Sequence, residues 1–183
     1  RSIWGVDGRG ARARSINGDN VLANLSYVTP IGTVTGFAYL VDQGETAVQA
    51  YKLSSQTYGG RLAGAHAFSK AVKLSYQFSY ARQSAYRRNP NRYDASYGLA
   101  DLTLDVKAWK FNAGYEVLGA DTGAALTSFQ TPLGTNFKFQ GWADKFLTTP
   151  ANGVRDLYAG GCYGWKQVGA IDAMTLQATW HRF

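Results

Sequence analysis

Residues 72–83 read VKLSYQFSYARQ, a stretch in which large apolar side chains alternate with polar or small ones. Successive side chains of a β-strand point to opposite faces, so this segment predicts a strand with one apolar face and one hydrated face. The apolar set is Val72, Leu74, Tyr76, Phe78 and Tyr80. The fold depends on what each of these two faces contacts.

The same alternation recurs along the 183 residues and predicts about eight strands. The periodic runs are residues 21–27, 33–41, 58–68, 72–83, 102–106, 109–117, 155–165 and 172–180. Residues 1–16 could hold a ninth strand, whose faces the pattern does not assign. Between residues 93 and 106 the apolar set changes from odd to even numbers near Ala100. This change predicts either a β-bulge or an upper half of the strand that lies above a membrane.

The composition narrows the class of protein. Only 17% of the residues are charged, 14% are aromatic and 21 are Gly, which is not typical of a helical protein. The net charge of +7 favours anionic partners, such as nucleic acid, acidic polysaccharide, anionic lipid or small solutes. One cysteine and two distant histidines predict no disulfide framework and no metal site. No run approaches the roughly 18 apolar residues of a spanning helix, which leaves a spanning barrel open.

The connections between the periodic runs alternate in length. Short turns fall near positions 30, 70, 107 and 168, while residues 42–55, 83–92 and 118–154 form long connections. Outer-membrane barrels have this layout, with short turns at one end and long loops at the other. Aromatic residues near strand ends are typical of the girdles of such barrels; they are Tyr27, Tyr80, Trp109, Tyr115, Trp165 and Trp180. The apolar face is therefore expected to meet lipid and the polar face to meet water.

Several segments in the second half of the chain carry a family resemblance. They are GYEVLGAD at 114–121, FQTPLGT at 129–135, FQGWADKFL at 139–147 and DLY at 156–158. Over residues 58–183 the chain resembles the alginate-export family of outer-membrane porins. The resemblance implies an antiparallel up-and-down transmembrane β-barrel of about 16–18 strands, monomeric, in the bacterial outer membrane, with a basic lumen for anionic solutes. The eight or nine strands expected here would then be one partial barrel domain.

The resemblance also implies that this chain is incomplete, because members of the family have at least two further strands after a segment such as WHRF at 180–183. Phe183 shares its alternation with His181, Thr179 and Gln177, which belong to the polar set, and not with Trp180. The terminal aromatic of a complete outer-membrane barrel would share its face with apolar residues. Phe183 is therefore interpreted as an internal residue of a longer barrel.

Three groups of residues are candidates for function. Side chains of the polar set are expected to line a pore, where fixed charges either select solutes or pair with one another; they are Arg61, Lys73, Gln77, Asp101, Asp105, Lys110 and Glu116. An extracellular basic cluster is expected to meet lipopolysaccharide phosphates or to capture anionic substrate, with nucleic acid disfavoured; it comprises Arg82, Arg87, Arg88 and Arg92. The aromatic-rich loop 118–154 either folds inward or caps the rim, and its constriction candidates are Lys138, Trp142, Asp144, Lys145 and Arg155.

An enzymatic function has little support. His66 and His181 have no Ser and Asp partners at a recognisable spacing and are interpreted as girdle or rim residues. No catalytic residue and no cofactor is predicted. The expected function is an outer-membrane porin for passive diffusion or export of anionic or saccharide solutes through a charged lumen. A soluble all-β carbohydrate-binding module with exposed Trp and Tyr is the alternative, and a barrel enzyme of the outer membrane is a third hypothesis.

Overall fold

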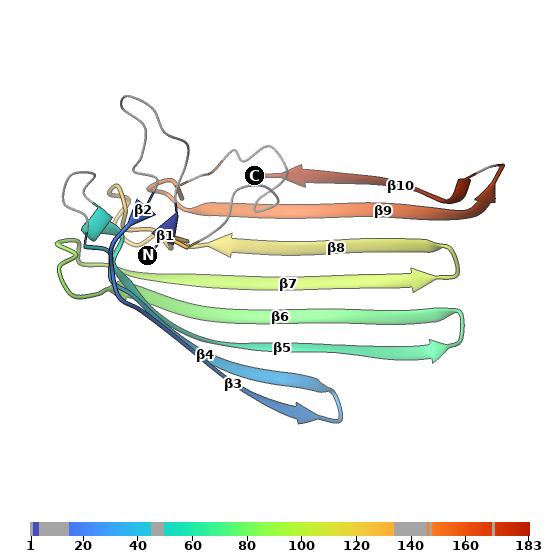
Figure 1. Ribbon diagram of the computed structural model, residues 1–183, viewed down its shortest axis with the longest axis horizontal. Coiled ribbons are helices and arrows are strands. Elements are labelled where there is room, and N and C mark those ends of the chain that lie inside the picture. Colours follow the sequence, from blue (N-terminus) through green and yellow to red (C-terminus); the bar gives the residue numbers. More distant parts are fainter. Residues whose placement is uncertain (1, 4–14, 45–49, 134–145, 147, 170) are drawn as a thin grey trace.

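A computed structural model describes the whole chain except residues 1, 4–14, 45–49, 134–145, 147 and 170 (Figure 1). Its main feature is one eight-stranded antiparallel sheet with the strand order β10-β9-β8-β7-β6-β5-β4-β3. Each strand pairs with its neighbours in the sequence, which makes the sheet an up-and-down meander. The all-β antiparallel prediction is therefore confirmed, while the described sheet is open and not closed into a barrel.

The strands are long and follow the periodic runs of the sequence. They are β3 (Asn20–Thr29), β4 (Gly32–Val41), β5 (Ser55–Ser69), β6 (Val72–Ala85), β7 (Asp94–Val106), β8 (Trp109–Leu118), β9 (Val154–Val168) and β10 (Ile171–Arg182). Two short strands, β1 (Ser2–Ile3) and β2 (Ser15–Ile16), pair only with each other. The described part of residues 1–16 therefore adds no ninth strand to the large sheet.

The two ends of the sheet differ in their connections. Every tight turn lies at one end, on the right in Figure 1, and every long connection lies at the other. We call these the turn end and the loop end. The turn at Gly32 needs glycine, because its φ of 124° is one that other residues rarely adopt. The predicted segregation of turn lengths is confirmed.

Of the two alternatives given for the change of parity near Ala100, the β-bulge is wrong. The β6–β7 ladder runs without a shift from Val72↔Val106 to Ser84↔Asp94. Tyr97 therefore lies on the same face as Lys73, and the change of apolar parity does not mark a change of register. The ladder between β5 and β6 does shift, between Ala67 and Ser69.

Helix is almost absent from the described residues. One 3₁₀ turn, η1 (Ala50–Leu53), precedes β5. None of the described helical structure is long and apolar enough to cross a membrane.

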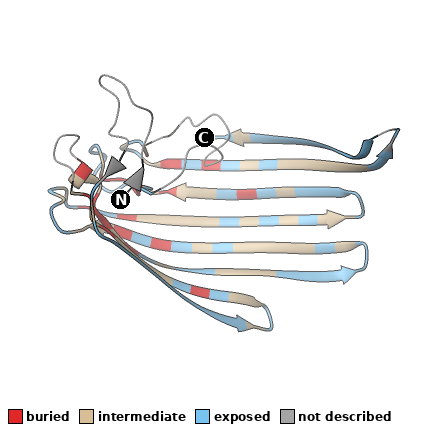
Figure 2. Cartoon of the chain, in the orientation of Figure 1, coloured by how far each residue is buried: buried red, intermediate tan, exposed pale blue. Residues whose placement is uncertain are grey.

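The sheet has two contrasting faces, which the ladder pairs define. We call the side of Leu74 and Phe78 the apolar face, and the side of Lys73 and Gln77 the polar face. Many large residues on the apolar face are exposed, with Leu25 at 80% and Leu176 at 66%. In Figure 2, most of the sheet away from the loop end is coloured as exposed or intermediate. The buried cluster lies instead on the polar face at the loop end and comprises Ala81, Tyr93, Ala95, Leu118, Phe129 and Val154.

Candidate functional site

The seven side chains predicted to line a pore share one face of the sheet. Lys73 is directly opposite Asp105, and Asp105 is directly opposite Lys110. Gln77 pairs with Asp101, and Arg61 pairs across the other edge of β6 with Ser79. Glu116 lies on the same side of β8 as Lys110. The structure therefore brings all seven to the polar face, where Lys73, Asp105 and Lys110 form one row across three strands.

The charges of the polar face are balanced in the described strands. Four basic residues lie there, Arg61, Lys73, Lys110 and Lys166, against four acidic ones, Asp101, Asp105, Glu116 and Asp156. The resemblance implied a basic lumen, but this face carries no net charge when His181 is neutral. The positive excess of the chain therefore lies elsewhere, on loops, turns and the apolar face.

Several of these charged groups hold one another in place. Lys110 Nζ lies 3.3 Å from Asp105 Oδ1. Asp101 Oδ2 accepts hydrogen bonds from Asn112 Nδ2 at 3.1 Å and from the Tyr158 hydroxyl at 2.6 Å. Tyr158 reaches across β8 because it lies over Gly114, where a Cβ atom would collide with its ring. A glycine at this position thus allows the contact between β9 and β7.

A second set of polar contacts lies closer to the loop end. The Tyr97 hydroxyl donates to Glu116 Oε1 at 2.8 Å. Asp156, which is 1% exposed and directly opposite Glu116, lies 2.9 Å from His181 Nδ1. His181 is therefore not a lipid-facing girdle residue, because its ring lies on the polar face near the end of β10 and contacts a buried carboxylate.

Tyr97, Asp156 and Tyr158 are site residues that the sequence interpretation did not assign to the polar face, whereas His181 was correctly placed in the polar set. The alternation of β9 contained the signal for two of the three. Asp156 and Tyr158 share the parity opposite to Leu157. Tyr97 carried no such signal, because the neighbouring residues of the same parity, Ala95 and Leu99, are apolar.

Part of the long connection between β8 and β9 covers the polar face. We call residues 127–133 the strap. Gln83 Nε2 donates to the carbonyl of Gln130 at 2.9 Å, and the Gln130 amide donates back to Gln83 Oε1 at 2.7 Å. Phe129 packs on Tyr97 with ring centroids 5.3 Å apart. The described part of this loop therefore lies over the sheet.

The strap encloses a cleft against the loop end of β4 to β8. The cleft has a volume of about 300 Å³, and its wall includes Phe37, Tyr39, Tyr97 and Phe129. Tyr93 lies in the same buried cluster, and its hydroxyl donates to Gln83 Oε1 at 3.2 Å. Burial raises the pKa of the Tyr93 phenol above its ordinary value. This packed end of the polar face is richer in aromatic side chains than its charged middle, although Glu116 also contributes to the cleft wall.

The constriction candidates are divided by the structure. Lys138, Trp142, Asp144 and Lys145 lie outside the described residues. Arg155 is part of β9, directly opposite Val117, and this places it on the apolar face. The structure therefore does not bring Arg155 to the strap.

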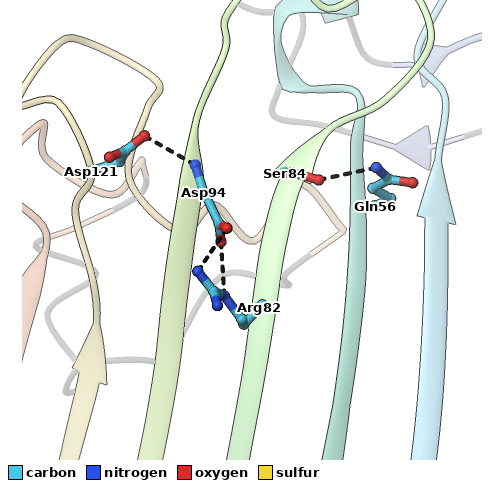
Figure 3. A network of polar contacts seen from close by, with 5 residues as sticks. All are labelled: Gln56, Arg82, Ser84, Asp94 and Asp121. Carbon is cyan, nitrogen blue, oxygen red and sulfur yellow. Dashed lines mark hydrogen bonds and ion pairs between the residues drawn. The ribbon is translucent and has the colours of Figure 1, made fainter.

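The four arginines of the predicted basic cluster occupy different surroundings. Arg82 lies on the apolar face of β6 and binds Asp94 through two hydrogen bonds of 2.9 and 2.7 Å (Figure 3). Arg87 forms an ion pair of 3.5 Å with Asp42, and Arg88 donates to the carbonyl of Gly44 at 3.3 Å. Arg92 is exposed. Arg87 and Arg88 thus reach one loop segment, whereas Arg82 belongs to the sheet.

Metal chemistry has no candidate site in the part of the chain that the structure describes, since no three His, Cys, Asp or Glu side chains form a suitable group. No protein-family model, curated protein or solved structure matches the chain.

Proposed function

We propose that this chain forms part of the wall of a bacterial outer-membrane porin related to the alginate-export family, through which anionic or saccharide solutes diffuse passively. The observation that carries the proposal is the uncovered apolar face. Leu25, Tyr80 and Leu176 are 80%, 58% and 66% exposed, and no residue of the buried cluster lies on their face of the sheet. Exposing such a surface to water is unfavourable, whereas exposing it to lipid chains is not.

Closure into a barrel follows from the same reasoning. The outer edges of β3 and β10 have no partner among the described residues. In lipid, each unpaired peptide group costs several kcal/mol, so both edges require further pairing. The two edge strands run in opposite directions, because they are the first and last of eight strands that alternate in direction. An even number of added strands therefore completes an antiparallel barrel, and about 16–18 strands in total leave a water-filled channel.

The polar face would then line the channel. Its balanced charges favour weak selectivity between anions and cations, and its hydroxyl and amide groups suit saccharides. The strap would narrow the channel at the loop end, because it lies over the polar face of β6 and β7. In this proposal, size exclusion dominates and the fixed charges adjust the passage of ions.

Extraction and conductance test the proposal. The full chain is expected to require detergent for extraction from bacterial membranes and to form discrete, ohmic conductance steps in planar bilayers. The ratio of anion to cation permeability is expected to lie close to one. Recovery of a monomer that stays in solution without detergent would contradict the proposal.

A soluble carbohydrate-binding module remains a second candidate because one aromatic cluster is suited to stacking on sugars. Trp109 stacks on Phe111 and contacts Tyr163, and Tyr163 contacts Trp165, with ring centroids 4.5 to 5.7 Å apart. Trp109 and Phe111 are about half exposed. Under this alternative the protein would be recovered without detergent and would bind glycans, and Trp109→Ala would abolish that binding.

A further inference from the structure

Two arginines of the apolar face lie close together at the loop end of β9 and β10. Arg182 is directly opposite Leu157 in the ladder, and Arg155 is two residues from Leu157 on the same strand. Arg155 and Arg182 are therefore diagonal neighbours on one face, a relation that places two residues about 7–8 Å apart. Both side chains are exposed.

In the described parts of β8, β9 and β10, no acidic side chain compensates the charge of this arginine pair on its own face. The nearest residues of β8 on that side are Tyr115 and Val117, while Glu116 and Asp156 belong to the polar face. Among the described residues, the side chains of Arg155 and Arg182 have no hydrogen bond or ion pair with one another or with a third residue. Arg82 is different, because Asp94 binds it on the same face.

The arginine pair lies at the level along the strands where the apolar face changes from mainly apolar to mainly polar side chains. Beyond it towards the loops lie polar side chains, Gln56, Arg82, Ser84 and Asp94 (Figure 3). Towards the turn end, Trp109 is eight residues from Val117, or about 26 Å along the strand. At the usual tilt of about 40° this corresponds to a band about 20 Å tall, close to the apolar band of outer-membrane barrels.

We propose that Arg155 and Arg182 bind the phosphate of an anionic lipid headgroup in the leaflet on the loop side. This inference rests on the proposed membrane location. The guanidinium group matches phosphate through paired hydrogen bonds, and its long apolar stem lies along a lipid-facing surface. Trp180, two residues from Arg182 on the same face, and Tyr115 add aromatic rings at the same interface. The ligand is recognised as a lipid because phosphate and acyl chains contact adjoining parts of one surface.

Lipid binding by the full chain in detergent micelles tests the site. Native mass spectrometry would compare short-chain phosphatidylglycerol with phosphatidylcholine of equal chain length, and inorganic phosphate would serve as the free anion. We expect a preference for phosphatidylglycerol that falls about 30-fold in the double variant Arg155→Gln/Arg182→Gln. The double variant Lys70→Gln/Lys107→Gln removes two exposed charges at the turn end, away from the loop-side leaflet, and is expected to keep the preference.

The charge-conserving variant Arg155→Lys/Arg182→Lys keeps the test decisive if the glutamine variant does not fold. It is expected to retain a preference for phosphatidylglycerol. Equal binding of the two lipids by the wild-type chain, an unchanged preference in the glutamine variant, or inorganic phosphate that displaces the lipid would each overturn the inference. A separate measurement of insertion into lipid vesicles distinguishes this failure from failure of the proposed function. If the chain stayed in solution and did not insert into vesicles, the proposed function itself would fail. Insertion into vesicles without a lipid preference in micelles would exclude only the lipid site.

Discussion

The two faces of this sheet reverse the usual relation between polarity and burial. At the loop end of the polar face, Gln83 and Asp156 are 2% and 1% exposed. On the opposite face, Leu25 and Leu176 are largely exposed. Gln83 is buried beneath the strap and Asp156 is buried beside His181, so burial here follows local cover and not the hydrophobicity of the residue. The medium on the apolar side therefore decides whether this sheet is stable, and that medium is the quantity to test.

The largest expected effect comes from placing a charge on each face at neighbouring positions of β7. Leu102→Arg is expected to lower the free energy of unfolding in lipid vesicles by about 2–4 kcal/mol, because it moves a guanidinium into hydrocarbon. Thr103→Arg, on the polar face, is expected to change it by less than about 1 kcal/mol. Urea titrations of both variants in vesicles would measure the difference. Equal effects would mean that water covers both faces.

Alternation in the sequence predicted which residues share a face, but not which face they occupy. Lys73, Asp105 and Lys110 were correctly grouped because polar side chains separate strictly from apolar ones in their strands. Phe37 and Tyr39 also share a parity, yet the ladder places them on the polar face opposite Gly59 and Thr57. Their apolar character reflects the cleft beneath the strap, which no local pattern reveals.

The error near Ala100 has the same cause. Ala95, Tyr97 and Leu99 are apolar residues of the polar face, because the strap covers that end of the strand. A long-range contact therefore produced what looked like a change of register. The buried pair of Asp156 and His181 was also beyond local prediction, because it depends on the register between β9 and β10.

The strap should depend on Gln83 more than on any exposed residue of the polar face. Gln83→Leu removes the partner of the Gln130 amide and carbonyl, as well as that of Tyr93. We expect the docking of the strap to weaken by about 2–3 kcal/mol, because buried polar groups lose their hydrogen bonds. Hydrogen exchange at the amides of Phe129 and Gln130 would report this.

Gln77→Leu is the matched control for this variant. Gln77 lies on the same strand and the same face but is not in contact with the strap, so exchange at Phe129 should stay unchanged. If both glutamine variants released the strap equally, the packing of the loop end would not depend on the Gln83 hydrogen bonds.

A smaller loss of stability is expected from a substitution at the position where Tyr158 crosses β8. Gly114→Ala would push the ring off its position and weaken its hydrogen bond to Asp101, at a cost of about 1–2 kcal/mol. Gly98→Ala on β7 is the control, because a Cβ atom there meets nothing within 4 Å. Denaturant midpoints of the two variants should differ. A midpoint for Gly114→Ala no lower than that for Gly98→Ala would show that the ring can move at no cost.

The smallest effect on stability is expected in the row of Asp105 and Lys110. Their ion pair involves a lysine side chain that is 56% exposed, so Lys110→Met should change the free energy of unfolding by less than about 1 kcal/mol. Its effect on ion passage should be larger than its effect on stability, because it leaves the polar face with one excess negative charge. We expect Lys110→Met to raise the relative permeability for cations and Asp105→Asn to lower it. Shifts of opposite sign, measured as reversal potentials under a salt gradient, would require both side chains to face the conducting water. Shifts of equal sign, or no shift, would mean that the polar face does not line the conducting pathway. The exposed apolar face would then be the only remaining support for a pore.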